Sequence, residues 1–134
     1  MPQSSEPRPL VLLVEDDRDS REMYAVALGL AGFRVAEAGT AADATRAAHA
    51  RRPDVIVSDL TLPDADGCDL LSELHQNTGT RGVPSIALTG RSSDDDIDRC
   101  TAAGCSRVLV KPCAPDALAE TIAEVLAEQA NRRG

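Results

Sequence analysis

Five short apolar runs alternate with longer segments of helical spacing along this chain. The runs are rich in Val, Ile and Leu and occupy residues 10–14, 33–36, 55–57, 83–88 and 108–110. Between them apolar residues recur at three- and four-residue intervals, as at Met23, Val26, Ala27 and Leu30. Strands that alternate with helices form a parallel sheet covered on both faces, which explains why these strands are apolar throughout. The sequence therefore predicts an α/β fold, a doubly wound five-stranded parallel sheet with five helices.

Residues that favour helix starts stand where this pattern requires helices to begin. Thr40 and Asp66 are suitable N-cap residues, and each is followed three positions later by an aspartate. Pro115 suits the first turn of the last helix. We find no repeat and no second domain. The sequence predicts one folded domain over residues 9–130, with a flexible N-terminal segment at 1–8 and a tail at 131–134.

Composition narrows the classes of function. The 134 residues include 14 basic and 22 acidic side chains, for a net charge of −8, and only two aromatic residues, Tyr24 and Phe33. Excess carboxylates repel phosphate backbones and base-stacking side chains are scarce, so we expect no direct nucleic-acid binding. No apolar run approaches the roughly 20 residues that span a bilayer, and the N-terminus lacks an apolar signal core. We expect a cytoplasmic protein without membrane insertion.

The cysteines do not form a recognisable framework. Cys68, Cys100, Cys105 and Cys113 include no CxxC pair, and no secretory signal accompanies them. Free cysteine packs as a small apolar residue, so we expect reduced thiols. A metal site that uses Cys100 and Cys105 stays open as an alternative.

Polar side chains stand at the ends of four predicted strands. Carboxyl ends of parallel strands meet at one edge of the sheet, where ligands bind near a topological switch point. The strand-end residues are Glu15 and Asp16 after the first strand, Asp59 after the third, Thr89 at the end of the fourth and Lys111 at the end of the fifth. We expect them to lie together. Other acids, such as Asp17 and Asp64, are expected to be solvated surface residues.

Three carboxylates beside one ammonium group leave an excess of negative charge at this edge. Such a site recruits a cation, and oxygen ligands suit Mg²⁺ or a similar divalent ion such as Mn²⁺. An Asp59 carboxylate oxygen can then attack a phosphoryl group in line and form an acyl phosphate. Thr89 and Lys111 are suited to stabilise the phosphoryl oxygens.

These segments resemble the receiver domain of two-component response regulators. The matching pieces are LLVEDD at 12–17, VSDLTLPDADG at 57–67, LTG at 88–90 and VKP at 110–112. They occur in the family's order within about residues 9–128. The resemblance implies a flavodoxin-like fold with strand order 2-1-3-4-5. It also implies that Asp59 is the phosphoacceptor. By the same resemblance, the metal is bound by Glu15, Asp16, Asp59 and the Thr61 backbone carbonyl. Thr89 is then the switch hydroxyl, and Lys111 contacts the phosphoryl group.

The same resemblance implies a signalling domain, not an enzyme, although it catalyses its own aspartyl phosphorylation and dephosphorylation. Its expected partners are a sensor histidine kinase or histidine phosphotransfer protein, and a downstream target protein. Because the sequence ends soon after the last predicted helix, we expect output by protein contact, unless the sequence is a piece of a larger regulator or hybrid kinase. A receiver-like interaction module that works without phosphorylation stays open.

Residue types exclude two other uses of these acids. Segment 62–73 has acids at calcium-loop spacing, but Leu62 occupies the first ligand position and has no side-chain oxygen. A phosphatase with an Asp-x-Asp pair needs a second carboxylate where Thr61 stands.

The sequence departs from the family at its usual aromatic switch. Val108 and Cys113 occupy positions where receivers often have aromatic residues, and Arg91 stands two positions after Thr89. Valine cannot present an aromatic ring. We therefore predict that the loop after Thr89 reshapes the output face by backbone motion, with Gly90 adding conformational freedom.

Overall fold

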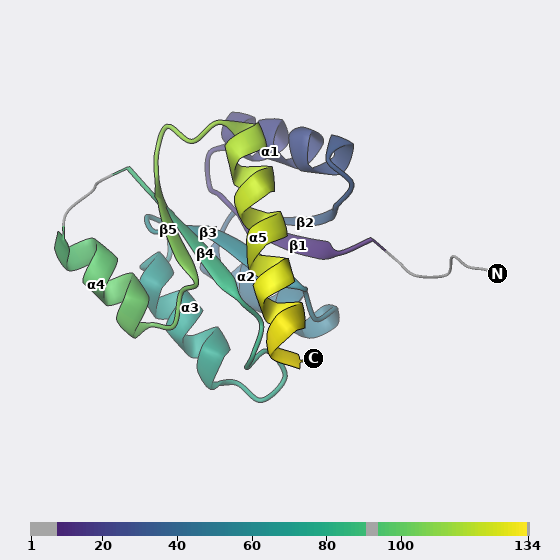
Figure 1. Ribbon diagram of the computed structural model, residues 1–134. Helices are drawn as coiled ribbons and strands as arrows, with labels where there is room; N and C mark the ends of the chain where they lie inside the picture. The colour runs from purple at the N-terminus through teal and green to yellow at the C-terminus, as the bar shows by residue number, and fades with distance from the viewer. Residues whose placement is uncertain (1–7, 91–93, 134) are drawn as a thin grey trace.

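The computed structural model describes residues 8–90 and 94–133, which form a single parallel sheet flanked by helices (Figure 1). Five strands and five helices alternate within the described residues, as the sequence predicts. In chain order the elements are β1 (Leu10–Val14), α1 (Arg18–Leu30), β2 (Arg34–Ala38), α2 (Ala41–Ala50), β3 (Val55–Asp59), α3 (Gly67–Gln76), β4 (Ser85–Thr89), α4 (Asp94–Ala102), β5 (Arg107–Val110) and α5 (Pro115–Arg133).

The strands are hydrogen-bonded in the order β2-β1-β3-β4-β5, and all four pairings are parallel. This confirms the predicted order. Val14, at the end of β1, pairs with Ser58, which directly precedes Asp59. Thr89, at the end of β4, pairs with Val110, which directly precedes Lys111. The carboxyl ends of these strands therefore form one edge, where the predicted site residues stand.

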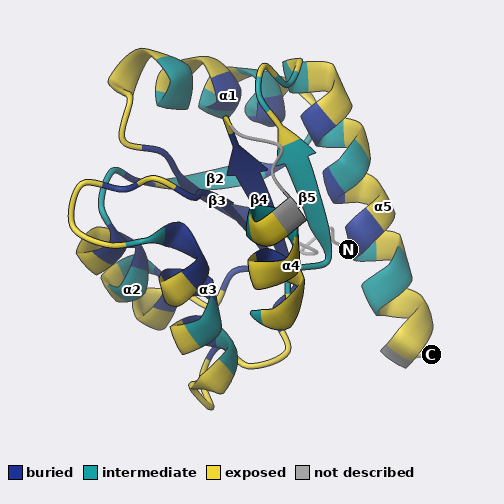
Figure 2. Ribbon diagram, turned by 90° about the vertical axis from the view of Figure 1, so that its left-hand side faces the viewer, coloured by how far each residue is buried: buried dark blue, intermediate teal, exposed yellow. Residues whose placement is uncertain are grey.

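A separate apolar core covers each face of the sheet. Leu12 and Ile56 belong to the core that includes residues of α2 and α3, whereas Leu13 and Val57 belong to the core with α1 and α5. Adjacent residues within β1 and within β3 thus point to opposite faces of the sheet and pack into different cores. Both faces are covered, so these strands are apolar on both sides. Figure 2 shows the result, with buried strands at the centre and exposed outer helix surfaces.

The four strands after β1 differ from the predicted ranges by one or two residues at their ends, and β2 and β4 show why. The apolar run at 33–36 predicts the second strand, but β2 spans Arg34–Ala38. This edge strand is only half buried over most of its length, so exposed Glu37 can continue it past the apolar run to the buried Ala38. The fourth run begins at Val83, yet β4 begins at Ser85 because Val83 closes a turn with its N–H on the Thr80 carbonyl.

Side-chain caps fix the helix starts. Thr40 accepts a hydrogen bond from the Asp43 N–H at 3.0 Å, and Asp66 accepts one from the Cys68 N–H at 2.7 Å. Both predicted N-caps are confirmed. The helix α5 begins at Pro115, as expected, and continues to Arg133, into the segment predicted as a tail.

Tyr24 ties α1 to the segment that joins β5 and α5. Its side chain is buried, and its hydroxyl donates a 2.7 Å hydrogen bond to the Cys113 carbonyl. A polar link thus joins α1 to this segment, in addition to the apolar core that α1 shares with α5. Within residues 8–90 and 94–133, no helix is both long enough and apolar enough to cross a bilayer.

Candidate functional site

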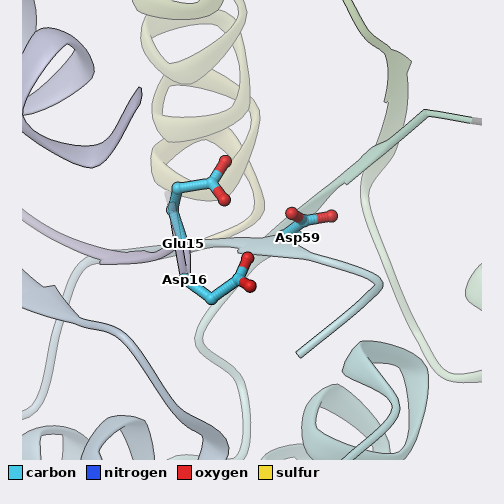
Figure 3. A group of neighbouring side chains, drawn as sticks. All are labelled: Glu15, Asp16 and Asp59. Carbon is cyan, nitrogen blue, oxygen red and sulfur yellow. The ribbon is translucent and has the colours of Figure 1, made fainter. Parts of the chain in front are cut away.

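Three acids meet at the carboxyl ends of β1 and β3. Glu15 and Asp16 directly follow β1, and Figure 3 shows their side chains beside that of Asp59. The sequence places Asp59 just after its strand, whereas the structure makes it the last residue of β3. Each residue offers a carboxylate oxygen within 4.8 Å of the other two. Glu15 and Asp59 are buried and Asp16 is exposed, so the group opens to solvent on one side.

Lys111 joins this acidic group from the end of β5, which lies beyond β4 in the sheet. Its Nζ donates hydrogen bonds to Glu15 Oε1 at 2.7 Å and to Asp59 Oδ2 at 3.0 Å. Burial raises the pKa of Glu15, and the negative charge of Asp59 raises it further, although the hydrogen bond from Lys111 opposes both. For Lys111, burial lowers the pKa, but the two carboxylates outweigh burial and leave the pKa raised. The lysine therefore remains charged and offsets part of the acid repulsion.

Backbone groups orient the same carboxylates. The Asp17 N–H donates to Glu15 Oε2 at 3.1 Å, and the Thr61 N–H donates to Asp59 Oδ1 at 3.3 Å. Arg21 holds the Glu15 backbone through a 2.9 Å hydrogen bond to its carbonyl. These contacts restrict the rotamers of Glu15 and Asp59 before any ligand arrives. The metal-ligand role of the Thr61 carbonyl stays a prediction.

Thr89 borders the site from β4. It is buried, and its carbonyl accepts a 2.7 Å hydrogen bond from the Lys111 N–H. A cleft of about 300 Å³ is lined by Thr61 and Thr89 and extends to Asp66 and Arg99. Of the sequence-predicted site residues, the structure therefore brings Glu15, Asp16, Asp59 and Lys111 into one cluster and places Thr61 and Thr89 at its margin.

Gly67 allows the loop after β3 to fold against the site. A β-carbon at this position would lie 2.2 Å from the Asp59 carbonyl oxygen and 2.7 Å from the Leu60 Cα. The Gly67 N–H also donates to the Leu60 carbonyl at 2.8 Å. Because both close atoms belong to the backbone, no side-chain rotation relieves such a clash. A glycine here sets the path of the chain that leaves Asp59.

The donor set fits a hard divalent cation. Carboxylate oxygens are the ligands that Mg²⁺ and Mn²⁺ prefer, and the excess negative charge of the three acids requires compensation beyond one lysine. Within the described ranges this is the only group of three potential ligands close enough to share an ion. Cys100 and Cys105, the alternative that the sequence leaves open, belong to no such group there.

Sequence reasoning missed two polar links near the site. Asp64 is exposed, as expected, but its carboxylate accepts hydrogen bonds from the Ala41 and Ala42 N–H groups at 2.8 and 3.1 Å. It thereby ties the loop after β3 to the start of α2. Arg99 of α4 forms a 3.0 Å ion pair with Asp66. Both contacts join residues far apart in sequence, so no local pattern indicates them.

Two of the residues that depart from the common pattern, Val108 and Cys113, pack against the apolar cores. Val108 is partly buried in β5 and packs against the core that contains α2 and α3. Cys113 packs against the other core, beside α5. Arg91 lies outside the described residues. At position 108, where receivers often have an aromatic residue, this chain therefore has an aliphatic side chain that packs against the core.

Comparisons of sequence identify related proteins. A family model for the response regulator receiver domain matches residues 11–123. The transcriptional regulatory protein PrrA of Mycobacterium tuberculosis is 40% identical over 119 residues, which cover 89% of this chain and 49% of PrrA. The chain spans about half the length of the curated relatives it matches.

Solved structures share the same architecture. A CheY-like response regulator receiver domain protein from Methanospirillum hungatei JF-1 matches with a TM-score of 0.88 and 28% identity, covering 93% of this chain and 98% of that one. The chemotaxis protein CheY4 of Vibrio cholerae matches with a TM-score of 0.84 and 30% identity, covering 88% and 98%. These similarities extend over nearly the whole described fold.

Proposed function

Because the chain belongs to the response regulator receiver domain family, we propose that it accepts a phosphoryl group on Asp59 in a reaction that depends on Mg²⁺. The donor is the phosphohistidine of a sensor histidine kinase or of a histidine phosphotransfer protein. The observation that carries the proposal is the contact of Lys111 with both Glu15 and Asp59, because it holds a buried acid and the proposed nucleophile on one ammonium group.

The phosphoryl transfer follows from this arrangement. An Asp59 carboxylate oxygen attacks the phosphorus in line, the bond from phosphorus to the histidine nitrogen breaks, and an acyl phosphate forms. Lys111 is 3.0 Å from Asp59 Oδ2 beforehand, so a small movement brings its ammonium group to a phosphoryl oxygen. The Thr89 hydroxyl is the second donor to these oxygens, from the neighbouring strand end. The protein supplies position and charge, and little covalent chemistry beyond the nucleophile.

Glu15, Asp16, Asp59 and the Thr61 carbonyl are the groups that would hold the divalent cation. When bound, the ion neutralises both the carboxylates and the incoming phosphoryl oxygens. Asp16 is the exposed member of the acidic group, so it gives the ion an open approach from solvent. Glu15 is held by Lys111 and by the Asp17 N–H, so it contributes a fixed anionic oxygen.

The output is a phosphorylation-dependent contact with a downstream protein. The chain acts as a signalling domain that undergoes phosphoryl transfer at its own aspartate. Val108 supplies no aromatic ring, so the change passes from Thr89 through the backbone toward α4 and β5. Any DNA contact, as the name of PrrA suggests for that relative, would come from a separate domain. Slower or faster hydrogen exchange in α4 and β5 on phosphorylation supports this route, and unchanged exchange contradicts it.

Phosphorylation is tested with a small-molecule acyl phosphate as donor. The chain is incubated with the donor and MgCl₂ and measured by intact mass. One phosphoryl group is expected per chain, with none in the Asp59→Asn variant or after chelation of the metal. Asp19→Asn, an exposed aspartate on α1, is the matched control and should be phosphorylated normally.

The outcomes separate the candidate functions. A folded wild-type chain that gains no phosphoryl group contradicts the proposal and favours an interaction module that works without phosphorylation. Repeated turnover of unrelated phosphoesters would instead indicate a phosphatase, whereas stoichiometric modification supports a receiver.

A further inference from the structure

Two cysteines from different helices meet in the core beneath the surface of α3 and α4. Cys68 is the second residue of α3, and Cys100 lies in the last turn of α4. Their sulfur atoms are 3.0 Å apart, and the two residues are 3% and 0% exposed. Both are free thiols. The contact joins positions 32 residues apart in sequence, which neither the spacing nor the composition of the chain indicates.

The two helices are held in this arrangement by a neighbouring ion pair. Asp66 precedes α3 as its N-cap, and its Oδ2 atom lies 3.0 Å from an Arg99 nitrogen. Arg99 directly precedes Cys100, and Asp66 stands two positions before Cys68. The ion pair and the sulfur contact therefore connect the same two helix segments. An ion pair between the same segments favours the closeness of the two sulfur atoms.

A groove between the helices leads from the surface to Cys68. The groove has a volume of about 250 Å³ and is lined by Cys68, Ser72, Arg99 and Ala103. Cys100 does not line it and is fully buried. A small oxidant in the groove would therefore meet Cys68 first, with Cys100 directly behind it.

We propose that Cys68 and Cys100 form a redox-active pair, which a hydroperoxide oxidises to an intramolecular disulfide that links α3 to α4. The Cys68 thiolate attacks the peroxide oxygen, the O–O bond breaks, and a sulfenic acid forms while the second oxygen leaves as water or alcohol. The Cys100 sulfur then attacks the sulfenic sulfur and displaces water. Overall, two thiols lose two protons and two electrons, and the hydroperoxide is reduced to water plus water or alcohol.

The environment makes this a slow reaction. Burial raises the pKa of Cys68 to about 12, with Cys100 and Asp66 adding to the increase and Arg99 opposing it. Burial also raises the pKa of Cys100, which faces Cys68, Cys105 and Arg99. Because the thiolate is the nucleophile, the rate of disulfide formation should rise about tenfold per pH unit from neutral pH until Cys68 ionises. The pair would respond to sustained peroxide rather than to brief exposure.

The disulfide would restrain the helix that follows the Thr89 loop. A bond from Cys100 to Cys68 adds a covalent restraint where Asp66 and Arg99 already form an ion pair. Any displacement of α4 away from α3 would then be blocked at its C-terminal end. This proposal goes beyond phosphoryl transfer and does not require it, so its test uses no phosphodonor.

The test is oxidation of the purified, reduced chain with hydrogen peroxide at pH 8, followed by alkylation of the remaining thiols. We expect a monomer with two alkylated cysteines instead of four, a mass lower by two hydrogens before alkylation, and full reversal by dithiothreitol. Hydrogen exchange in α4 should slow in the oxidised chain. Cys100 and Cys105 share one tryptic peptide between Arg99 and Arg107, so the partner of Cys68 is assigned by fragmentation of the linked peptide.

Matched variants identify the pair. Cys105→Ser and Cys113→Ser should still form the disulfide, whereas Cys68→Ser should not. Four alkylated thiols in the treated, folded wild type would overturn the proposal, as would a bond between other cysteines, bonds only between chains, or oxidation to sulfinic acid alone. The wild-type mapping decides the question even if a variant fails to fold. Failure to phosphorylate Asp59 has no bearing on this result.

Discussion

The ammonium group of Lys111 lies 2.7 Å from Glu15 Oε1, in an ion pair that joins residues 96 positions apart. The Glu15 side chain is 1% exposed, so it has almost no access to water as an alternative partner. Lys111 is also the only lysine in the chain. The compensation of a buried carboxylate at the end of β1 thus depends on one residue at the end of β5.

Replacing Lys111 with methionine should destabilise the metal-free protein. The change leaves Glu15 buried without its cation, and we expect a loss of about 2 kcal/mol in the free energy of unfolding, less than for a fully buried pair because Lys111 is partly exposed. Urea denaturation measures the effect. Arg18→Met removes an exposed ion pair with Glu22 and should change the free energy by less than about 0.5 kcal/mol. Equal effects of both variants would contradict a special role for Lys111.

Divalent cations should stabilise the folded protein through the acidic group. Because the ion binds the folded state alone, Mg²⁺ at ten times its dissociation constant should add about 1.4 kcal/mol to the free energy of unfolding. The measurement is thermal or urea denaturation at increasing MgCl₂. Asp16→Asn should lose most of this gain, and Asp19→Asn should keep it. A Mg²⁺ response that survives in Asp16→Asn would place the ion elsewhere.

Gly67→Ala should be among the most damaging substitutions in the chain. The added carbon would lie 2.2 Å from the Asp59 carbonyl oxygen, so the loop after β3 must move, at a cost of about 3 kcal/mol or more. Gly29→Ala is the control, because apart from the adjacent backbone of its own helix no atom lies within 4 Å of its β-carbon, and alanine favours the helix by about 0.5 to 1 kcal/mol. In chemical denaturation, the free energy of unfolding should fall in Gly67→Ala and rise in Gly29→Ala.

The contribution of Asp64 to the free energy of unfolding should depend on pH. Hydrogen bonds from the Ala41 and Ala42 N–H groups lower the pKa of Asp64 in the folded protein. Its contribution to stability is therefore fully present above the unfolded aspartate pKa of about 3.9 and is lost as the pH falls through the lower folded value. We expect Asp64→Ala to be less stable than wild type at pH 7, with the difference shrinking below about pH 4. Urea denaturation of both proteins across this pH range measures the difference in stability. A difference that does not change with pH would contradict the role of the Asp64 carboxylate.

The fold was predictable because its signals are local and repeated. Apolar runs such as 55–57 and caps such as Thr40 each report on a few neighbouring residues, and β3 and α2 appear where these signals place them. Boundaries were less certain where burial is partial. Glu37 and Ala38 extend β2 past its predicted run, and the end of β3 is polar because Asp59 belongs to the site.

The site was predictable as a set of residues but not as a set of contacts. Strand ends in a parallel sheet meet at one edge, which is enough to group Glu15, Asp59 and Lys111. The geometry that joins them depends on loop paths, and loop paths depend on contacts between distant residues. The hydrogen bonds from α2 to Asp64 and the sulfur contact between α3 and α4 are of this kind.

The link from Tyr24 to Cys113 makes the chain its own optical probe. Tyr24 is the only tyrosine, and the sequence contains no tryptophan, so intrinsic near-ultraviolet fluorescence arises essentially from one phenol. That phenol donates its hydroxyl proton to the carbonyl two residues after Lys111. A rearrangement of this segment that lengthens or breaks the hydrogen bond should change the emission lifetime. Events at the reaction site can be followed in unlabelled protein, in real time, from a single known position.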